Sequence, residues 1–287
     1  MSAKVYFTSG ITPEGVVAVY DALGVELPGK VAIKVHSGEV GNQNFIRPDF
    51  FKPMVDRING TIVESNTGYP TGKRHSSRSH WQTMELHGWT SIAPVDILDE
   101  DGTIQLPVPD GVRIKNDIVG SHLANYDSIL VLSHFKGHPM GGFGGAIKNI
   151  AIGLASSRGK LRIHSGGRVW RLLKPDQDAF LDALADAAKA VVTHFGTGMA
   201  FVNVMKAMSV DCDCVAKARP PEMDDIGILA SLDPVALDQA CVDLVYGADD
   251  PAKASLIERI EARHGVRTLE AAEALGVGKR QYELVRL

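Results

Sequence analysis

Three side chains in the middle of the chain, His138, Lys148 and His164, have the chemistry of a catalytic site. A neutral histidine can act as a metal ligand or a general base near pH 7. A lysine among other cations can form a covalent bond to a carbonyl or thioacyl group. Glycine-rich breaks lie within the spacings of ten and sixteen residues, so one helix face cannot hold all three. We therefore predict that these three residues are catalytic and that only the tertiary structure brings them together.

Four glycines, Gly141, Gly142, Gly144 and Gly145, lie between the first histidine and the lysine. They follow the apolar run 129–132, which predicts a short buried strand, and they precede a predicted helix. Glycines between a strand and a helix leave backbone N–H groups free to point at an anion, and the helix dipole adds positive charge. We predict that they bind the phosphate, sulfate or carboxylate of a cofactor or substrate. The alternative is a simple glycine-rich turn.

The stretch after this helix is rich in cations and ends at His164. Lys160 and Arg162 alternate with Leu161 and Ile163, a period of two that predicts a strand with one cationic face. His164 continues that face. We therefore expect Lys160 to bind an anionic cofactor and His164 to face the same cleft.

A second group with metal-binding chemistry is Asp-Cys-Asp-Cys at 211–214. Zinc takes four ligands, so the two thiolates would need histidines from elsewhere in the chain. The predicted metal ligands are His134, His138, His164, Cys212 and Cys214. The alternative is a polar loop with partly buried cysteines. Three cysteines in the whole chain are too few for the four thiolates of a cysteine-ligated iron–sulfur cluster, so we expect no such cluster.

The composition is typical of a globular protein with a sizeable core, since 45% of the 287 residues are hydrophobic and 22% are charged. This length predicts one large domain or two modest ones. The net charge of −4 argues against a general nucleic-acid binder, and no apolar run has the length of a membrane span. Few cysteines, and an N-terminus that enters a strand-like pattern at once, predict a reducing, cytoplasmic location.

Strand patterns alternate with helix patterns in the N-terminal half, with strands at 4–7, 30–35 and 61–64 and helices at 13–23 and 48–58. This alternation predicts an α/β fold with a parallel sheet and crossover helices. Ligands bind at the carboxyl ends of such strands, where the pattern places His36, the loop 66–69 and His134. We therefore count Tyr69 among the cofactor-binding candidates.

The rest of the chain predicts further elements of both kinds. Residues 79–87 predict a helix that carries His80 and His87, a pattern more typical of a solvated surface than of a metal site. The other predicted elements are a β-hairpin or small meander at 95–115, helices at 176–195 and 233–244, and strands at 200–204 and 226–230. We predict an N-terminal α/β lobe over 1–120, which includes the hairpin region, and a C-terminal α/β lobe over 121–287, which carries the His/Gly/Lys motif. The best hinge candidate is 165–175.

Ordered motifs along nearly the whole chain resemble those of one family. The motifs are Glu-Ser-Asn-Thr-Gly-Tyr at 64–69, residues 132–149, residues 155–165, Asp-Cys-Asp-Cys at 211–214, and residues 225–240. The chain resembles domain-of-unknown-function family 362, whose members are described as uncharacterised iron–sulfur centre proteins. Many members carry a two-cluster ferredoxin insert after the histidine that matches His164. Here the chain continues directly into the helix predicted at 176–195, so the resemblance does not imply an iron–sulfur cluster.

Residues 138–148, His-Pro-Met-Gly-Gly-Phe-Gly-Gly-Ala-Ile-Lys, are similar to the element H-x-x-[AG]-G-[FY]-x-G-G-x-K of the nickel-pincer lactate racemases. In those enzymes the lysine holds the pincer nucleotide and a later histidine ligates nickel, roles that the resemblance implies for Lys148 and His164. Arg47-Pro48 is similar to the racemase Thr-Arg-Pro element, which implies a cofactor contact for Arg47. The resemblance also implies two α/β lobes with mostly parallel sheets and a cleft between them.

Together these features predict an enzyme that transfers a proton or a hydride on a small carboxylate or hydroxy acid, as a racemase, an isomerase or an oxidoreductase. The expected cofactor is a divalent transition metal, nickel or zinc, or an anionic nucleotide-like molecule. The alternative is a non-catalytic metal or cofactor carrier, or the partner of a separate ferredoxin. The expected partners are a small anionic ligand, a second copy in a homodimer and a separate redox protein, with no nucleic acid and no membrane.

Overall fold

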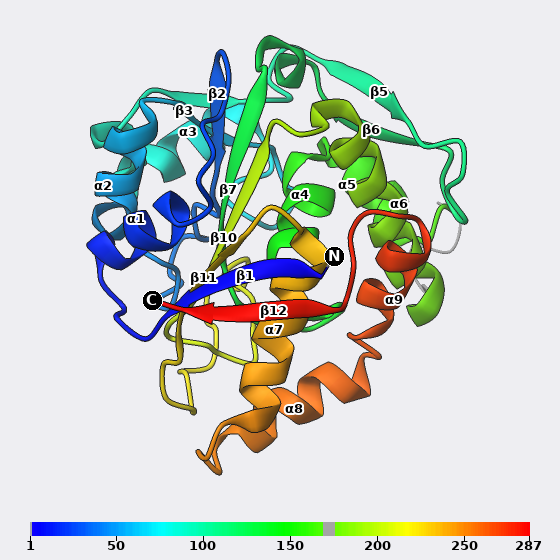
Figure 1. The fold of residues 1–287 in the computed structure, drawn as a ribbon. Coiled ribbons are helices and arrows are strands. Elements are labelled where there is room, and N and C mark those ends of the chain that lie inside the picture. Colours follow the sequence, from blue (N-terminus) through cyan, green and yellow to red (C-terminus); the bar gives the residue numbers. More distant parts are fainter. Residues whose placement is uncertain (1, 169–175) are drawn as a thin grey trace.

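The structure is a computed structural model that describes residues 2–168 and 176–287 (Figure 1). One eight-stranded sheet forms its centre, in the order β12 (Tyr282–Arg286), β1 (Ala3–Thr8), β11 (Gly227–Ser231), β10 (Met199–Met205), β7 (Ser128–His134), β2 (Val31–Lys34), β3 (Thr61–Glu64) and β4 (Val95–Ile97). β11 is antiparallel to both of its neighbours, and the other neighbouring pairs are parallel. The predicted α/β fold with a mostly parallel sheet is confirmed.

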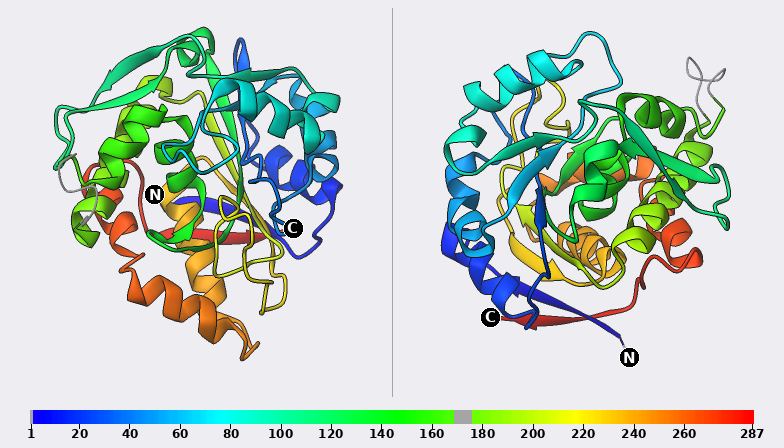
Figure 2. Two further views of the ribbon diagram at one scale, coloured as in Figure 1. Left: turned by 180° about the vertical axis from the view of Figure 1, so that it is seen from behind. Right: turned by 90° about the horizontal axis from the view of Figure 1, so that it is seen from above.

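Helices cover both faces of this sheet, because each parallel connection must cross over it. One face carries α1 (Pro13–Asp21) and α2 (Pro48–Ile58), and the other carries α4 (Ala146–Leu154), α6 (Gln177–Phe195) and α7 (Pro234–Gly247) (Figure 1, Figure 2). Residues of β7 alternate between the two layers. Leu130 and Leu132 belong to the apolar core with α1 and α2, and Ile129 and Val131 belong to the core with α4, α6 and α7. Burial of both faces explains the uninterrupted apolar run of this strand.

Shorter elements surround the sheet: α3 (Ser77–Leu86), η1 (Trp89–Ser91), β5 (Thr103–Pro107), β6 (Asn116–Gly120), η2 (Ser121–Asn125), β8 (Lys136–His138), β9 (Gly142–Gly144), α5 (Ser157–His164), α8 (Lys253–Ala262) and α9 (Arg267–Ala274). β5 and β6 form one antiparallel hairpin, and β8 and β9 form another. The hairpin predicted at 95–115 therefore lies further along the chain, and residues 95–97 join the main sheet instead. In the described residues, no helix is both long enough and apolar enough to cross a membrane.

The strand predicted at 160–164 is wrong, because these residues belong to the helix α5. The side chain of Ser156 caps this helix by accepting a hydrogen bond from the backbone N–H of Gly159 (3.2 Å). Lys160 and His164 are both buried, and their separation of four residues places them on one helix face. Residues 160–164 are too few to distinguish a helical pattern from the alternation of a strand.

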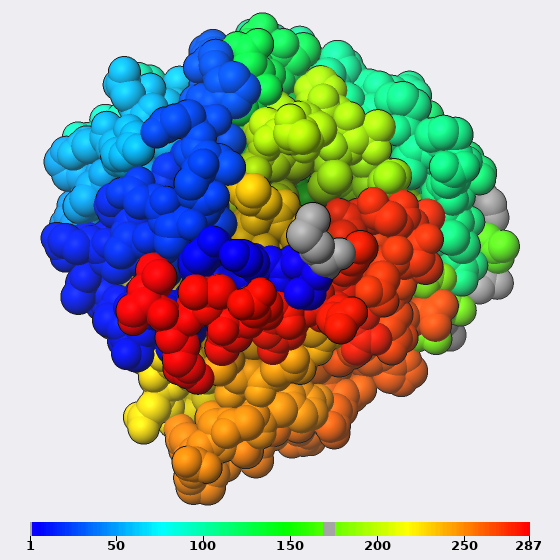
Figure 3. All heavy atoms as spheres, in the orientation of Figure 1, coloured from blue at the N-terminus to red at the C-terminus, as the bar shows by residue number. Residues whose placement is uncertain are grey.

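The sheet continues across the lobe boundary predicted at residue 120. β2, β3 and β4 come from the predicted N-terminal lobe, and β7, β10 and β11 come from the predicted C-terminal lobe. β1 pairs with β11 and with β12 at the far edge, where β1 and β12 lie side by side (Figure 3). The two predicted lobes thus share one sheet, and their division at residue 120 stays a prediction. Residues 169–175 of the predicted hinge lie outside the described residues.

Candidate functional site

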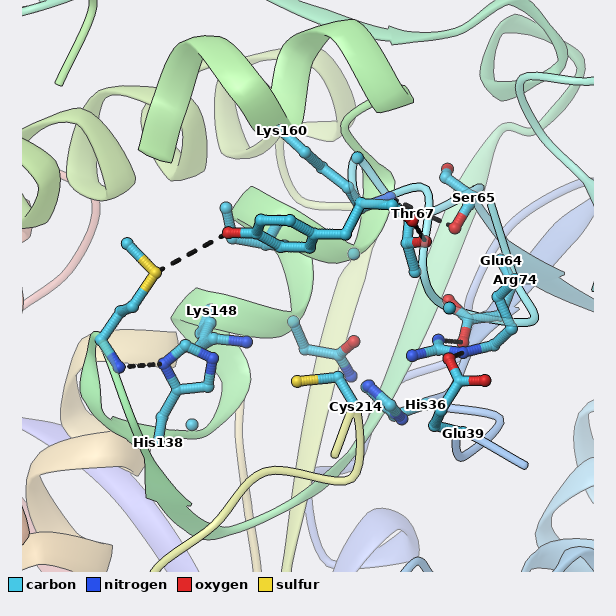
Figure 4. Close-up of a pocket in the computed structure, with 18 of the residues that line it drawn as sticks. His36, Glu39, Glu64, Ser65, Thr67, Arg74, His138, Lys148, Lys160 and Cys214 are labelled. Carbon is cyan, nitrogen blue, oxygen red and sulfur yellow. Dashed lines mark hydrogen bonds and ion pairs between the residues drawn. The ribbon is translucent and has the colours of Figure 1, made fainter. Parts of the chain in front are cut away.

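A pocket of about 350 Å³ lies where β2, β3 and β7 end (Figure 4). His36 follows β2, Glu64 ends β3 and His134 ends β7, and all three line the pocket. Open α/β sheets bind ligands at this edge, because the loops that follow the parallel strands gather there. The other walls come from the loop 65–74, the β8–β9 hairpin, α4, α5 and Cys214.

Most of the residues predicted from the sequence line this one pocket, namely His134, His138, Lys148, Lys160, His164, Tyr69, Gly144, Gly145 and Cys214. Cys212 is buried, and its sulfur lies within 4.8 Å of that of Cys214. Arg47 is elsewhere, with its guanidinium over the ring of Phe45 at 4.1 Å. Gly141 and Gly142 also lie outside the pocket lining. The catalytic and binding roles of these residues stay predictions.

The glycine loop does not form the open anion cradle that the sequence predicted. Asp238, from α7, accepts hydrogen bonds from the N–H groups of Ala146 (2.7 Å) and Ile147 (2.9 Å), the first residues of α4. Its carboxylate thus occupies the helix N-terminus that was expected to bind an external anion. Gly145 permits this approach, since a Cβ there would lie 2.3 Å from Oδ1 of Asp238. Burial raises the pKa of Asp238 to about 6.

Lys148 projects from α4 into the pocket, next to His138 (Figure 4). Its ammonium forms no hydrogen bond and no ion pair with a carboxylate among the residues that the structure describes. Burial lowers the pKa values of His138 and His164, and the positive charge of Lys148 lowers them further. A half-buried ammonium without a carboxylate partner is suited to bind an anionic ligand.

His164 lines the pocket as a neutral imidazole, and its Nε2 forms no hydrogen bond among the described residues. Its Nδ1 donates a hydrogen bond to the carbonyl oxygen of Lys160 (2.6 Å), which leaves the lone pair on Nε2. The ring stacks on Phe180, with centroids 5.3 Å apart, and contacts Tyr69 edge-on at 5.6 Å. Burial lowers the pKa of His164 to about 3, so the ring is uncharged at neutral pH.

Lys160 connects α5 to the loop after β3. Its Nζ donates to the carbonyl oxygens of Ser65 (3.2 Å), Asn66 (2.7 Å) and Ala155 (2.8 Å). Burial lowers the pKa of Lys160 to about 7. Because these bonds use the three protons of the ammonium, the side chain fixes the pocket wall and has no donor left for a cofactor.

His138 has the opposite tautomer to His164. Its Nδ1 accepts hydrogen bonds from the backbone N–H groups of Met140 (3.2 Å) and Gly141 (2.8 Å), so the neutral ring carries its proton on Nε2. Burial and the charge of Lys148 lower the pKa of His138 to about 4. A ring nitrogen of His138 lies within 4.8 Å of the Cys212 sulfur.

His134 lies beneath the pocket in a network of charged groups. Its Nδ1 contacts Asp213 Oδ1 (3.0 Å), and its Nε2 contacts the carbonyl oxygen of Lys206 (2.7 Å). Lys136 also binds Asp213, at 2.7 Å. Burial opposes the charge of Asp213, but His134 and Lys136 hold its pKa well below its usual range. Both ring nitrogens of His134 contact oxygen atoms of the protein, so neither nitrogen is available to a metal.

Three residues are close enough to share a metal ion, because ligand atoms of His138, Cys212 and Cys214 all lie within 4.8 Å of one another. The hydrogen bonds of His138 do not fit this role. Its single lone pair is on Nδ1 and is used by two backbone N–H groups, so Nε2 presents a proton and not a lone pair. His164 keeps an available lone pair and is the better candidate for a metal ligand.

A cluster of buried charges at the far side of the pocket was not predicted (Figure 4). Lys34 and Glu64 form an ion pair (2.7 Å), and the Arg74 guanidinium lies 3.4 Å from Glu39 and 3.6 Å from Glu64. Burial opposes the charge of Glu64, but Lys34 and the other cations hold its pKa well below its usual range. One sequence feature could have predicted this cluster, namely the charged residue at the end of each apolar strand. Lys34 ends β2 and Glu64 ends β3.

The prediction that His80 lies on a solvated helix surface is wrong. His80 is fully buried, with Nδ1 at 3.3 Å from Asn66 Oδ1, and its Nε2 has no hydrogen-bond partner among the described residues. Burial lowers the pKa of His80 to about 3. His87 is half-buried, with Nδ1 at 2.8 Å from the carbonyl oxygen of Ser37. The histidine-bearing face of α3 therefore supports the pocket loops.

Two solved structures and one protein family are similar to this chain. The lactate racemase apoprotein from Thermoanaerobacterium thermosaccharolyticum has a similar structure, with a TM-score of 0.47 and 16% identity over 85% of this chain and 58% of that chain. A crystal structure of a protein from Thermotoga maritima gives a TM-score of 0.45 and 12% identity over 80% of this chain and 57% of that chain. The chain thus spans less than two thirds of either protein. No curated protein matches its sequence. The profile of the family called Domain of unknown function (DUF362) matches residues 31–243, most of the chain, and the chain therefore belongs to the DUF362 family.

Proposed function

We propose that the chain is an enzyme that binds a small carboxylate, such as a hydroxy acid, in this pocket and transfers a proton to or from it. One observation carries the proposal. The ammonium of Lys148, which has no carboxylate partner among the described residues, lines the same pocket as the available lone pair of His164. Together they supply a charge to hold an anion and an acceptor for its proton.

Each residue has a distinct role in this proposal. Lys148 binds the carboxylate by a charge-assisted hydrogen bond. His164 accepts a hydrogen bond from the hydroxyl group, or a proton, through Nε2. In the empty pocket His164 is a weak base, because burial lowers its pKa to about 3. A bound anion stabilises the imidazolium and raises this pKa toward the range useful for catalysis.

The proposal also includes a cofactor, which is either a divalent metal or an anionic nucleotide-like molecule. If a divalent metal, nickel or zinc, is bound, Nε2 of His164 would ligate it in place of acting as the proton acceptor, and the remaining ligands would come from the substrate or from an anionic nucleotide-like cofactor. Such a metal would polarise the substrate oxygens as a Lewis acid. Lys148 is the residue placed to hold an anionic cofactor, by an ion pair or by a covalent bond to a carbonyl or thioacyl group.

The test measures binding and proton exchange separately. Binding of a panel of 2-hydroxy acids is measured by calorimetry, and α-proton exchange is followed by proton NMR in heavy water. We expect Lys148→Met to weaken binding by about tenfold or more, the cost of one charge-assisted hydrogen bond. We expect His164→Gln to bind but to slow exchange by about a hundredfold. Lys217→Met, which removes an exposed lysine outside the pocket, is the matched control.

The outcomes distinguish the enzyme from the alternative functions. Binding that Lys148→Met abolishes, without any exchange in the wild-type protein, would favour a non-catalytic carrier. Binding that is equal in the wild type, Lys148→Met and Lys217→Met would place the anion site elsewhere and contradict the proposal.

A further inference from the structure

We propose that Cys212 and Cys214 form a thiol–disulfide exchange pair at the pocket wall, which reduces small disulfides that enter the pocket. The pair would become a Cys212–Cys214 disulfide in the process. This activity uses side chains other than Lys148 and His164. It therefore does not depend on the carboxylate chemistry proposed above.

The backbone around the two cysteines is held on several sides. The N–H of Val215 donates to the carbonyl oxygen of Cys212 (2.9 Å), and the carbonyl oxygen of Asp213 accepts from the N–H of Glu39 (2.8 Å). The side chain of Asp213 is fixed by Lys136 (2.7 Å). This loop keeps the two sulfur atoms within 4.8 Å of each other, and a disulfide bond needs them to approach to about 2.0 Å.

The two sulfur atoms differ in access. Cys214 is exposed and lines the pocket, where its sulfur lies between His138 and His36 (Figure 4). Cys212 is 1% exposed. Cys214 is therefore the residue that an incoming disulfide meets first, and Cys212 is placed to resolve the mixed disulfide from behind.

Two histidine rings lie beside the cysteine pair. A ring nitrogen of His138 lies within 4.8 Å of both sulfur atoms, and its Nδ1 is occupied by backbone N–H groups, which leaves a proton on Nε2. Nδ1 of His36 likewise accepts from the N–H of Gly38 (3.2 Å), and the sulfur of Cys214 lies between the two rings (Figure 4). These rings are placed to donate hydrogen bonds to a thiolate of the pair, which stabilises the charged form.

The reaction takes place in two balanced steps. Cys214 gives its proton to water, and its thiolate attacks one sulfur of the disulfide RSSR. A Cys214–SR bond forms, the S–S bond breaks, and RS⁻ leaves and takes up a proton from water. Cys212 then loses its proton and attacks Cys214 Sγ, which forms the Cys212–Cys214 disulfide and releases the second RS⁻. Two protein thiols are oxidised, and one RSSR is reduced to two RSH.

The first experiment uses the wild-type chain and oxidised glutathione. Reduced protein is incubated with oxidised glutathione in the presence of a metal chelator, and the products are identified by intact mass spectrometry and peptide mapping. We expect the loss of two hydrogen atoms per chain and a disulfide that maps to Cys212 and Cys214. Because this result needs no variant, it stands even if a substituted chain does not fold.

Matched variants then separate the two roles, with circular dichroism as the check on folding. Cys212→Ser should accumulate the mixed glutathione disulfide on Cys214, because the resolving thiol is missing. Cys214→Ser should react at least about tenfold more slowly, because the remaining thiol of the pair is buried. Cys241→Ala should behave like the wild type, since Cys241 lies in the core beside Asn203 (3.4 Å).

Two results would overturn the proposal. One is a wild-type chain that forms only a stable glutathione adduct, or none, without the Cys212–Cys214 disulfide. The other is stoichiometric zinc that Cys212 and Cys214 retain against the chelator and that prevents oxidation, which would make the pair a metal site. Neither result would affect binding of a hydroxy acid at Lys148, so the two proposals fail separately.

Discussion

Two walls of the same pocket carry neutral histidines that present opposite groups. On the β8–β9 wall, His138 accepts backbone hydrogen bonds at Nδ1 and presents a proton at Nε2. On the α5 wall, His164 donates from Nδ1 to the carbonyl oxygen of Lys160 and presents a lone pair at Nε2. Burial lowers the pKa of both rings, so charge does not distinguish them. The backbone beside each ring decides whether it donates or accepts.

The supports of the two walls also differ. The β8–β9 wall continues into α4, whose first N–H groups are bound by the carboxylate of Asp238 from α7. The α5 wall is held by the ammonium of Lys160, which binds three carbonyl oxygens. An internal anion therefore fixes one side of the pocket and an internal cation fixes the other. Among the described residues, Lys148 is the lysine of the pocket lining that has neither a hydrogen bond nor a carboxylate partner.

The largest effect is expected from removing the support of the β8–β9 wall. Asp238→Ala leaves the N–H groups of Ala146 and Ile147 and the amide of Asn203 without their acceptor. We expect the free energy of unfolding to fall by about 3 kcal/mol, as for other buried charged acceptors. Urea denaturation followed by circular dichroism measures this change. Asp238→Asn, which keeps one carbonyl acceptor, should lose less, and equal losses in the two variants would contradict this role of the carboxylate.

A smaller effect is expected on how the free energy of unfolding depends on pH, which differs between the two histidines. A ring whose pKa is lower in the folded state is protonated first in the unfolded chain, so stability falls as the pH falls from about 6.5 to the folded pKa. That value is about 4 for His138 and about 3 for His164. The two windows differ by about one pH unit, so the contributions of the two rings to the free energy of unfolding differ by at most about 1.4 kcal/mol.

The measurement is the pH dependence of urea unfolding for the wild type, His138→Gln and His164→Gln. The His138→Gln difference from the wild type should stop changing near pH 4, and the His164→Gln difference should continue to change to about pH 3. Titrating groups far from the pocket cancel in these differences. Identical pH profiles for the two variants would contradict the separate environments assigned to the rings.

The smallest effect is expected at the rim of the α5 wall. Tyr69 contacts the ring of His164 edge-on, and its hydroxyl lies 3.8 Å from the Met140 sulfur, a weak hydrogen bond. Tyr69→Phe keeps the ring and should change the free energy of unfolding by less than about 0.5 kcal/mol. Tyr69→Ala should expose His164 to water and raise its pKa, which histidine NMR measures. An unchanged pKa in Tyr69→Ala would show that the tyrosine does not shield the ring.

Much of the architecture could be predicted from local patterns. The spacing of apolar residues predicted α2 at its observed bounds and α6 to within one residue of its start, since a helix repeats every few residues within one segment. The carboxyl ends of the strands correctly indicated where a pocket would form. The pattern failed at α5, because five residues are too few to separate a period of two from a period near four.

The sequence by itself determined the α/β alternation and the stretch that supplies His138, Lys148 and His164, because both depend on residues near one another in the chain. Only the tertiary structure decided what these residues can do. The acceptor at the start of α4 is Asp238, 92 residues away from Ala146, and the thiols beside His138 come from a loop after β10. The proton positions of His138 and His164 follow from backbone groups that turn toward each ring only in the folded chain. Burial and hydrogen-bond geometry set pKa values and available lone pairs, and neither is encoded in residue type or spacing alone.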